Sequence, residues 1–141
     1  MLKFSTRGND ALVVMTDLAE HNSEKNVPLK LLSLRRNLSV KYLEQILIQL
    51  AKANLVIGLR GINGGYKLVK PASEYTVGEI LRAMEGDLSC ISVTENNTVK
   101  TLGNETFWKD LDKTINDYVN SVTLDQIVKK NAEGSNFNYC I

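Results

Sequence analysis

The sequence is poor in the residues from which disulfide frameworks and membrane spans are built. It has two cysteines, Cys90 and Cys140, and no apolar run of about 18 residues, the least that a transmembrane helix needs. The N-terminal stretch MLKFSTRGND lacks the apolar segment of a signal peptide. We therefore expect a cytoplasmic protein that enters no membrane and keeps its thiols reduced, although a Cys90–Cys140 bridge stays open.

Histidine is scarcer still, which bears on metal sites and catalysis. The one histidine, His21, falls on the surface of a predicted helix, and no second cysteine or histidine lies near Cys90 in the sequence. A metal site is therefore not expected. No catalytic triad, pair of carboxylates or cofactor-binding loop stands out, so the sequence favours a protein that is not an enzyme.

The charge is unevenly distributed along the chain, although the net charge is only +1. Residues 1–70 hold eleven Lys or Arg against five Asp or Glu, whereas residues 71–141 hold six against eleven. A basic half favours binding to a polyanion such as nucleic acid, because neutralising phosphates releases counterions. The alternative is an uneven surface without such a partner. The length of 141 residues and the 43% hydrophobic content indicate one compact domain with an appendage.

Hydrophobic periodicity predicts three helices in the basic half. The first spans residues 8–22, with Asp17 on the face opposite its apolar residues. The second spans residues 28–37 and the third residues 39–53, so a short turn joins them as a helix-turn-helix. The exposed face of the third helix is either merely solvated or a surface that reaches phosphates and base edges, and it carries Ser39, Lys41, Tyr42, Glu44, Gln45 and Gln49.

The glycine-rich stretch GLRGINGGYKLVK, residues 58–70, fits either a phosphate-binding loop or a hairpin turn. Its spacing matches neither GxxxxGK followed by Ser or Thr nor GxGxxG opening a helix. The β-branched residues before the turn and the alternation after it predict a β-hairpin over residues 55–70, which we call the wing. Three helices and this hairpin make a winged helix-turn-helix, with Arg60 and Lys67 placed to meet a minor groove or phosphates.

The acidic half returns to a helical pattern. Thr76 and Glu79 form a capping box that starts a helix, and Gly86 ends it. A helix over residues 105–122 carries more apolar surface than a domain edge leaves in water, which predicts a partner helix. Thr123 and Gln126 form a second capping box, for a short helix that ends near residue 130.

The expected fold class is mainly α with a small β-hairpin, in the form of a winged helix-turn-helix followed by a long C-terminal dimerisation helix. Four segments divide the chain. They are a DNA-binding domain over residues 1–86, a mobile loop with Cys90 over 87–104, the long helix and its short successor over 105–131, and a flexible tail over 132–141.

Four motifs resemble, in order and spacing, the Rrf-two family of bacterial winged-helix transcription regulators. They are FSTRG, LSVKYLEQILIQLAKANLV, RGINGGYKL and TVGEILRAMEG. The match is close over residues 1–86 and loose over the long helix. The resemblance implies a homodimer, joined by the helix over 105–122, that binds a pseudo-palindromic site in double-stranded DNA with two wings and two recognition helices.

The resemblance also implies which residues contact DNA. By position they are Ser5, Thr6 and Arg7 near the backbone, Ser39, Lys41, Tyr42, Glu44 and Gln45 on the third helix, and Arg60 at the base of the wing. Glu44 is a special case, because a carboxylate accepts a hydrogen bond from cytosine N4 but is repelled by phosphate. It would specify sequence rather than add affinity. The alternative is a surface charge paired with Lys41 or another nearby lysine.

One departure from the family concerns its iron–sulfur cluster. Members that sense iron or nitric oxide carry three closely spaced cysteines after the EG that ends the helix, whereas GDLSCISVTENNTVKTLGN offers only Cys90. One thiolate cannot hold a cluster, so no cofactor is expected. Cys90 as a redox-sensing thiol is a weaker hypothesis, because DLSCIS has no basic neighbour to lower the pKa of the thiol.

Cluster-free relatives include the repressor of cysteine metabolism, and the tail FNYCI is similar to that branch. The resemblance implies that Tyr139 and Ile141 anchor the tail in the active site of O-acetylserine sulfhydrylase (cysteine synthase). The terminal carboxylate would sit on backbone N–H groups. The alternative is a frayed terminus. A different class of function also stays open, an adaptor that uses the winged-helix scaffold without binding DNA.

Overall fold

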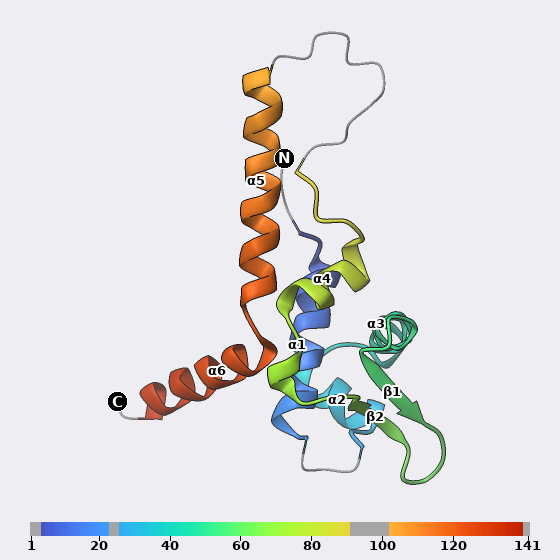
Figure 1. The fold of residues 1–141 in the computed structure, drawn as a ribbon. Helices are drawn as coiled ribbons and strands as arrows, with labels where there is room; N and C mark the ends of the chain where they lie inside the picture. Colours follow the sequence, from blue (N-terminus) through green and yellow to red (C-terminus); the bar gives the residue numbers. More distant parts are fainter. Residues whose placement is uncertain (1–3, 23–25, 91–101, 140–141) are drawn as a thin grey trace.

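The computed structural model describes residues 4–22, 26–90 and 102–139, and it is helical apart from one hairpin (Figure 1). In chain order the elements are α1 (Thr6–Glu20), α2 (Leu29–Arg36), α3 (Val40–Lys52), β1 (Val56–Leu59), β2 (Gly65–Leu68), the 3-10 turn η1 (Ala72–Glu74), α4 (Val77–Glu85), α5 (Leu102–Ser121) and α6 (Leu124–Tyr139). The expected winged helix-turn-helix is confirmed. None of the described helices is long and apolar enough to cross a membrane.

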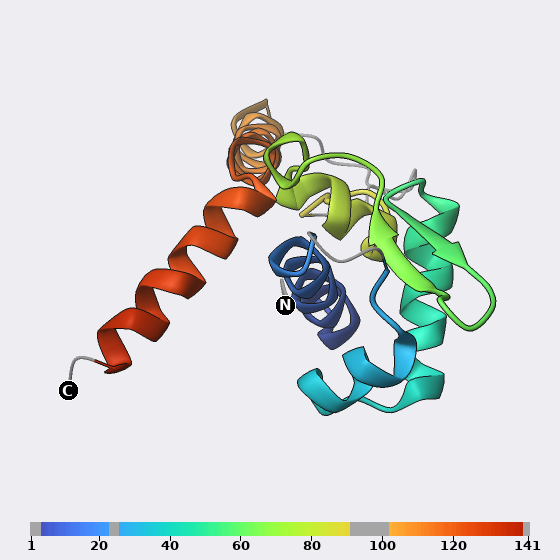
Figure 2. The same cartoon turned by 90° about the horizontal axis from the view of Figure 1, so that it is seen from below.

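The helix-turn-helix is set by one left-handed residue. Asn37 ends α2 with φ 53°, a conformation that asparagine tolerates better than most residues. Ser39 then starts α3, because its side chain accepts a hydrogen bond from the N–H of Tyr42 at 3.1 Å. The chain therefore turns in three residues, which places α2 and α3 against α1 (Figure 2).

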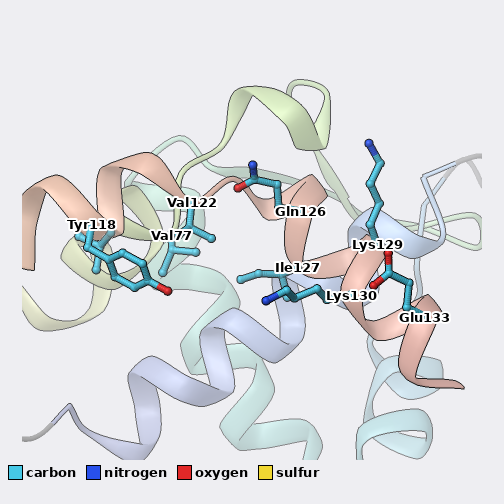
Figure 3. A pocket seen from close by; sticks show the side chains of 9 residues that line it. Val77, Tyr118, Val122, Gln126, Ile127, Lys129, Lys130 and Glu133 are labelled. Carbon is cyan, nitrogen blue, oxygen red and sulfur yellow. The ribbon is translucent and has the colours of Figure 1, made fainter. Parts of the chain in front are cut away.

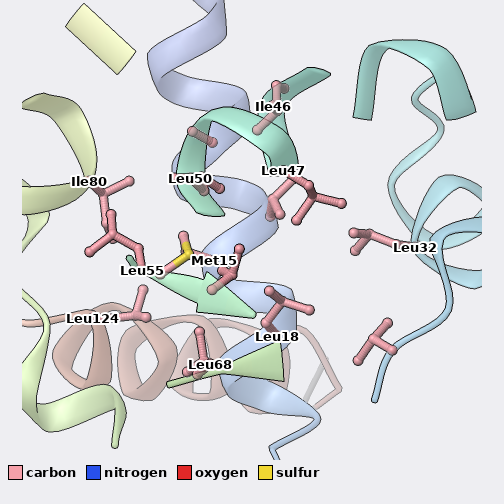
Figure 4. Packing of buried hydrophobic residues seen from close by; sticks show 14 of the residues in the cluster. Met15, Leu18, Leu32, Ile46, Leu47, Leu50, Leu55, Leu68, Ile80 and Leu124 are labelled. Carbon is pink, nitrogen blue, oxygen red and sulfur yellow. The ribbon is translucent and has the colours of Figure 1, made fainter. Parts of the chain in front are cut away.

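The core lies where α1, α2, α3 and α4 meet the base of the wing (Figure 4). The apolar face of α3 is fully buried: Leu43, Ile46, Leu47 and Leu50. Burying each such side chain contributes about 1.5–3 kcal/mol, so this helix is held by packing rather than by propensity. Tyr75 is also buried, and its hydroxyl donates to the carbonyl of Leu55 at 2.7 Å, which fixes η1 beneath the hairpin.

The wing is a two-stranded antiparallel hairpin with Val56 opposite Leu68 and Leu59 opposite Gly65. A third piece of chain supports it, since Val27 and Tyr66 exchange backbone hydrogen bonds of 2.8 and 2.9 Å. Gly65 has φ +149°, and a Cβ there would lie 2.4 Å from the Val27 carbonyl oxygen. Only glycine allows the two backbones to approach this closely.

The C-terminal half consists of two helices. Figure 1 shows α5 beside α4 at its lower end and projecting beyond the other helices, with α6 leading from that lower end away to the C-terminus. Leu124 is buried and ties α6 to the core, because its N–H donates to the Tyr75 carbonyl at 3.0 Å. The predicted second capping box is present: Thr123 N–H donates to Gln126 Oε1 at 3.0 Å, and Gln126 N–H to Thr123 Oγ1 at 3.2 Å.

Two helix boundaries differ from the prediction. The helix predicted from residue 105 begins at Leu102, and α6 continues to Tyr139 although an end near residue 130 was expected. The run of Gly, Ser and Asn after Glu133 suggested a tail without structure. A single glycine costs a helix only about 1 kcal/mol, and neither proline nor a β-branched run follows Gly134 to stop it.

Candidate nucleic-acid interface

The exposed face of α3 carries three of the predicted DNA contacts. Lys41, Glu44 and Gln45 are all exposed, while the apolar stripe on the same helix is buried. Ser39 is exposed too, but its hydroxyl oxygen caps α3. A helix N-terminus with a free cationic neighbour attracts anions, so this end of α3 suits a phosphate as well as base edges.

Tyr42 is held by the protein rather than free. It is half-buried, and its hydroxyl donates to Asp10 Oδ2 at 2.8 Å. Burial and the Asp10 hydrogen bond raise the pKa of this hydroxyl above its usual value. Tyr42 is therefore neutral at physiological pH. It connects α3 to α1 and can still accept a hydrogen bond from a DNA partner.

Gln49 is not on the free face, where the sequence placed it. Its Oε1 accepts from Arg7 Nη2 at 2.9 Å, and its Nε2 donates to the Ala83 carbonyl at 3.0 Å. Through this side chain, α3 is joined to the start of α1 and to the C-terminal part of α4. Arg7 Nε is buried and has no hydrogen-bond partner within the described residues. Because Nη2 is bonded to Gln49 and Nε is shielded from solvent, only part of the guanidinium can reach a phosphate.

Ser5 and Thr6 begin α1, where the sequence placed backbone contacts. Ser5 caps the helix by accepting from Gly8 N–H at 3.2 Å. The Glu85 carboxylate accepts from both the Ser5 N–H, at 2.9 Å, and the Ser5 hydroxyl. Thr6 is exposed. A protein carboxylate thus occupies hydrogen-bond donors that a phosphate would otherwise use.

The wing places Arg60 and Lys67 in solvent, and it carries an apolar residue that sequence reasoning missed. Arg60 and Lys67 are exposed. Between them Ile62 is exposed at 105% of its reference surface. Figures 1 and 2 both place the wing and α3 on the same side of the molecule. The two elements that carry most of the predicted contacts therefore lie on one side of the molecule.

Two arginines that contribute to the basic half are neutralised inside the domain. Asp17 has no exposed surface, although the sequence placed it on the polar face of the first helix. Its carboxylate meets Arg35 Nη2 and Arg36 Nε, each at 2.7 Å, and Arg36 Nη2 also meets Glu20 at 3.2 Å. Helical periodicity cannot find this cluster, because the arginines come from α2. They bind α2 to α1 instead of facing a ligand.

Cys90 lies beside α5. Its N–H donates to Asp112 Oδ1 at 2.6 Å, and the hydrogen bond to Asp112 raises the pKa of the thiol above its ordinary value. A raised pKa lowers the fraction of reactive thiolate. Asn116 also holds this segment, since its Nδ2 donates to the Leu88 carbonyl at 3.0 Å. A redox role of Cys90 stays a prediction, which the raised pKa of the thiol does not favour.

The side chains of the described residues offer few donors for an iron–sulfur cluster or another metal. Within residues 4–22, 26–90 and 102–139, no group of three or more His, Cys, Asp or Glu could hold a metal ion. The sequence over residues 91–101 adds neither cysteine nor histidine. These donors do not fit a thiolate-ligated cluster, so the absence of such a cofactor stays a prediction that chemical analysis of the protein can check.

A hollow of about 600 Å³ opens between α5 and α6 (Figure 3). Its wall is apolar, and its rim carries charged side chains from α6. The residues that line it are Val77, Tyr118, Val119, Val122, Gln126, Ile127, Lys129, Lys130 and Glu133. Tyr118 is 68% exposed there, and Phe107, near the other end of α5, is 57% exposed. Large aromatic surface of this kind marks a binding surface rather than a free helix face.

The fold and the exposed face of α3 define the class: a winged helix-turn-helix protein with a long C-terminal helix. The chain belongs to the Rrf2 family, whose model, described as an iron-dependent transcriptional regulator, matches residues 4–130. This confirms the resemblance found in the motifs. Its relatives are transcriptional regulators and not enzymes, and the protein is a transcriptional regulator of this family.

Three similar proteins span nearly the whole chain. A relative from Neisseria meningitidis serogroup A, named provisionally as an HTH-type transcriptional regulator, is 38% identical over 139 residues, 95% of this chain and 94% of its own. The transcriptional regulator IscR of Vibrio atlanticus is 33% identical over 133 residues, 92% of this chain and 77% of its own. The structure of CymR (YrzC), the global cysteine regulator of B. subtilis, matches with a TM-score of 0.81 and 33% identity, over 92% of this chain and 98% of that one.

Proposed function

We propose that the protein is a DNA-binding repressor that acts as a homodimer on a pseudo-palindromic operator. The observation that carries this proposal is that α3 and the wing lie on one side of the molecule and bear exposed polar groups. Lys41 and Arg60 are exposed and belong to none of the described ion pairs, and Gln45 is exposed as well. Phosphate contacts fix the protein on the duplex and base contacts specify sequence, and this face offers groups for both.

The test of DNA binding starts from immobilised full-length protein and sheared DNA from its own source at moderate salt. A recurring inverted repeat among the retained fragments supports the proposal, because a two-fold protein binds a two-fold site. Binding to that repeat should fall log-linearly with salt. Transcription from the repeat in vitro then separates a repressor from an activator, since a repressor lowers the transcript in proportion to occupancy.

The homodimer is supported by the exposed stripe on α5. Phe107 and Tyr118 are eleven residues apart, which is close to three full turns, so both lie on one face about 16 Å from each other. In an antiparallel pair of α5 helices with its two-fold axis near residues 112 and 113, each Phe107 meets Tyr118 of the other copy. The aromatic pair Phe107–Trp108 of one copy, with ring centroids 5.0 Å apart, then covers the hollow between α5 and α6 of the other copy. Analytical ultracentrifugation should give a mass of about twice 15.7 kDa.

Control of cysteine metabolism is the finer part of the proposal. It is supported by the likeness to CymR, the global cysteine regulator of B. subtilis. The genes beside the recovered operators test it directly, and sulfur-metabolism genes are the expected result. Binding of the tail to O-acetylserine sulfhydrylase belongs to the same proposal. Ile141 lies outside the described residues, and for Tyr139 the structure describes only the backbone, so deletion of Ile141 with loss of sulfhydrylase affinity is its test.

The adaptor alternative makes the opposite prediction. An adaptor would retain no DNA sequence, and its protein partners would bind without the steep salt dependence of phosphate contacts. The exposed cations of α3 and the wing favour DNA over this alternative, and a blank in the DNA selection, repeated with the sulfhydrylase present, would reverse that preference.

A further inference from the structure

The tip of the wing carries an apolar side chain that the fold does not use. Ile62 is exposed at 105% of its reference surface, more than any other large apolar residue among those described. Leu59, at the end of β1, is 49% exposed beside it. Isolated apolar residues on a surface are common. This one is unusual because it stands at the end of a rigid projection and next to a cation.

The backbone of the wing holds Ile62 outward. Gly64 N–H donates to the Gly61 carbonyl at 2.9 Å and closes the turn. Asn26 Nδ2 donates to the Asn63 carbonyl at 3.1 Å and supports the turn from outside. A Cβ at Gly64 would lie 2.5 Å from the Leu59 carbonyl oxygen, so the backbone of the turn packs too closely to admit a side chain there. A turn fixed from both sides pre-organises the residue that it carries.

The surroundings of Ile62 match a nucleic-acid groove. Arg60 lies two residues before it, and a shallow hollow of about 410 Å³ runs from the tip along the wing toward Pro28 and Leu29. Four glycines line this hollow, so backbone can approach a ligand there without side-chain interference. A cation suits the phosphate rim of a groove, and an apolar tip suits the sugars and base edges within it.

Resting on the DNA binding proposed above, we propose that Ile62 is a specificity-determining residue that enters the minor groove and selects A·T over G·C base pairs. The chemistry follows from the groove floor. There, A·T pairs present only acceptors, whereas G·C adds the guanine N2 amino group. Isoleucine offers no acceptor to this donor and cannot occupy the space that the amino group fills. The wing thereby reads base composition where α3, in the major groove, reads base identity.

The experiment uses the full-length protein and three versions of an operator recovered by the genomic selection. Base pairs under the wing, located by hydroxyl-radical footprinting, are made A·T, G·C or inosine·C. Inosine lacks the N2 amino group, so inosine·C resembles A·T in the minor groove and G·C in the major groove. Ile62→Ser removes the apolar tip and Ile62→Val keeps it. Val69→Ser, at an exposed apolar position at the other end of β2, is the matched control.

We expect the wild type, Ile62→Val and Val69→Ser to bind the A·T and inosine·C versions about equally and the G·C version about ten-fold more weakly, within the range for one unfavourable base pair. Ile62→Ser should bind all three versions within about two-fold of each other. Its salt slope should be unchanged, because no charge is altered. A full preference for A·T in Ile62→Ser overturns the inference, as does a wild type that treats all three versions alike or rejects inosine·C. A wild type that binds none of them overturns the proposed function itself.

Discussion

Asp17 and Arg35 meet at 2.7 Å in a place where Asp17 has no contact with solvent. The carboxylate also holds Arg36 at 2.7 Å, so one buried acid neutralises two cations of α2. A buried ion pair is costly to form, but breaking it leaves an uncompensated charge in the interior. This contact therefore fixes how α2, and α3 behind it, sits against α1.

Asp17→Asn should lower the free energy of unfolding by about 3 kcal/mol, because it leaves two arginines without their carboxylate. Urea denaturation followed by circular dichroism measures this. The matched control is Asp117→Asn, since Asp117 is 62% exposed in its pair with Lys113. It should change stability by less than about 0.5 kcal/mol. Equal effects of the two substitutions would show that the buried cluster does not hold α2.

Arg60→Gln should weaken binding to the operator at every sequence and reduce the slope of log affinity against log salt by about 2, because each protomer of the homodimer loses one phosphate contact. Lys67→Gln should act in the same way, and the slope for the double variant should fall by about 4, because the dimer then loses four contacts. Fluorescence anisotropy across a salt series measures the slope. Lys113→Gln is the control, since this exposed lysine lies on α5. An unchanged slope in the double variant would remove the wing cations from the interface.

Glu44→Ala should increase affinity for non-specific DNA, because a carboxylate facing phosphates is removed. It should also relax the requirement at one C·G pair of the operator by about 1–3 kcal/mol, the usual value of a direct base contact. Competition assays with operators changed one base pair at a time measure both effects. If Glu44 is a surface charge that only pairs with Lys41, the substitution leaves the base preference at every position intact.

The antiparallel register of α5 makes a prediction about cross-linking. Two single-cysteine variants, Phe107→Cys and Tyr118→Cys, are prepared with Cys90 and Cys140 replaced by serine. After mixing and subunit exchange, mild oxidation should join one variant to the other, and each variant alone should stay unlinked. Strong self-linking of Phe107→Cys would indicate a parallel pair and would contradict the register.

The Cys90 thiol should react slowly with iodoacetamide near neutral pH, because the hydrogen bond to Asp112 raises its pKa and reduces the thiolate fraction. Asp112→Asn should lower that pKa and speed alkylation at any pH below it. Rates measured from pH 7 to 10 in a Cys140→Ser background test this. A wild-type thiol that titrates at or below its ordinary value would restore the hypothesis of a redox sensor.

The fold could be predicted because its signals are local. The apolar stripe of α3 repeats within one helix, and the glycines of the wing allow a tight turn between two neighbouring strands. The predicted capping box at Thr123 and Gln126 is likewise a contact between near neighbours. Family motifs confirmed the same arrangement, and the class of function followed from them.

Features that depend on distant contacts were missed. Asp17 occupies a polar position on its own helix and is buried only because Arg35 and Arg36 arrive from another one. The sequence pattern predicts an exposed position for Gln49, yet its side chain is hydrogen-bonded to Arg7 and to the Ala83 carbonyl. The roles of the DNA-contacting residues stay predictions, because side-chain positions in a free protein do not reveal which groups meet a base.

The bonds of Gln49 have a mechanical consequence when they are joined to those of Arg82. Gln49 connects α3 to α4, and Arg82 connects α4 to α5 through Asn116 and Asn120 at 2.6 and 2.8 Å. Hydrogen bonds thus join α3, the proposed recognition helix, to α5, the proposed dimer helix, through α4. In a dimer, a tilt of α5 would change the distance between the two recognition helices. The affinity for operators with altered half-site spacing would then report how far α5 has tilted.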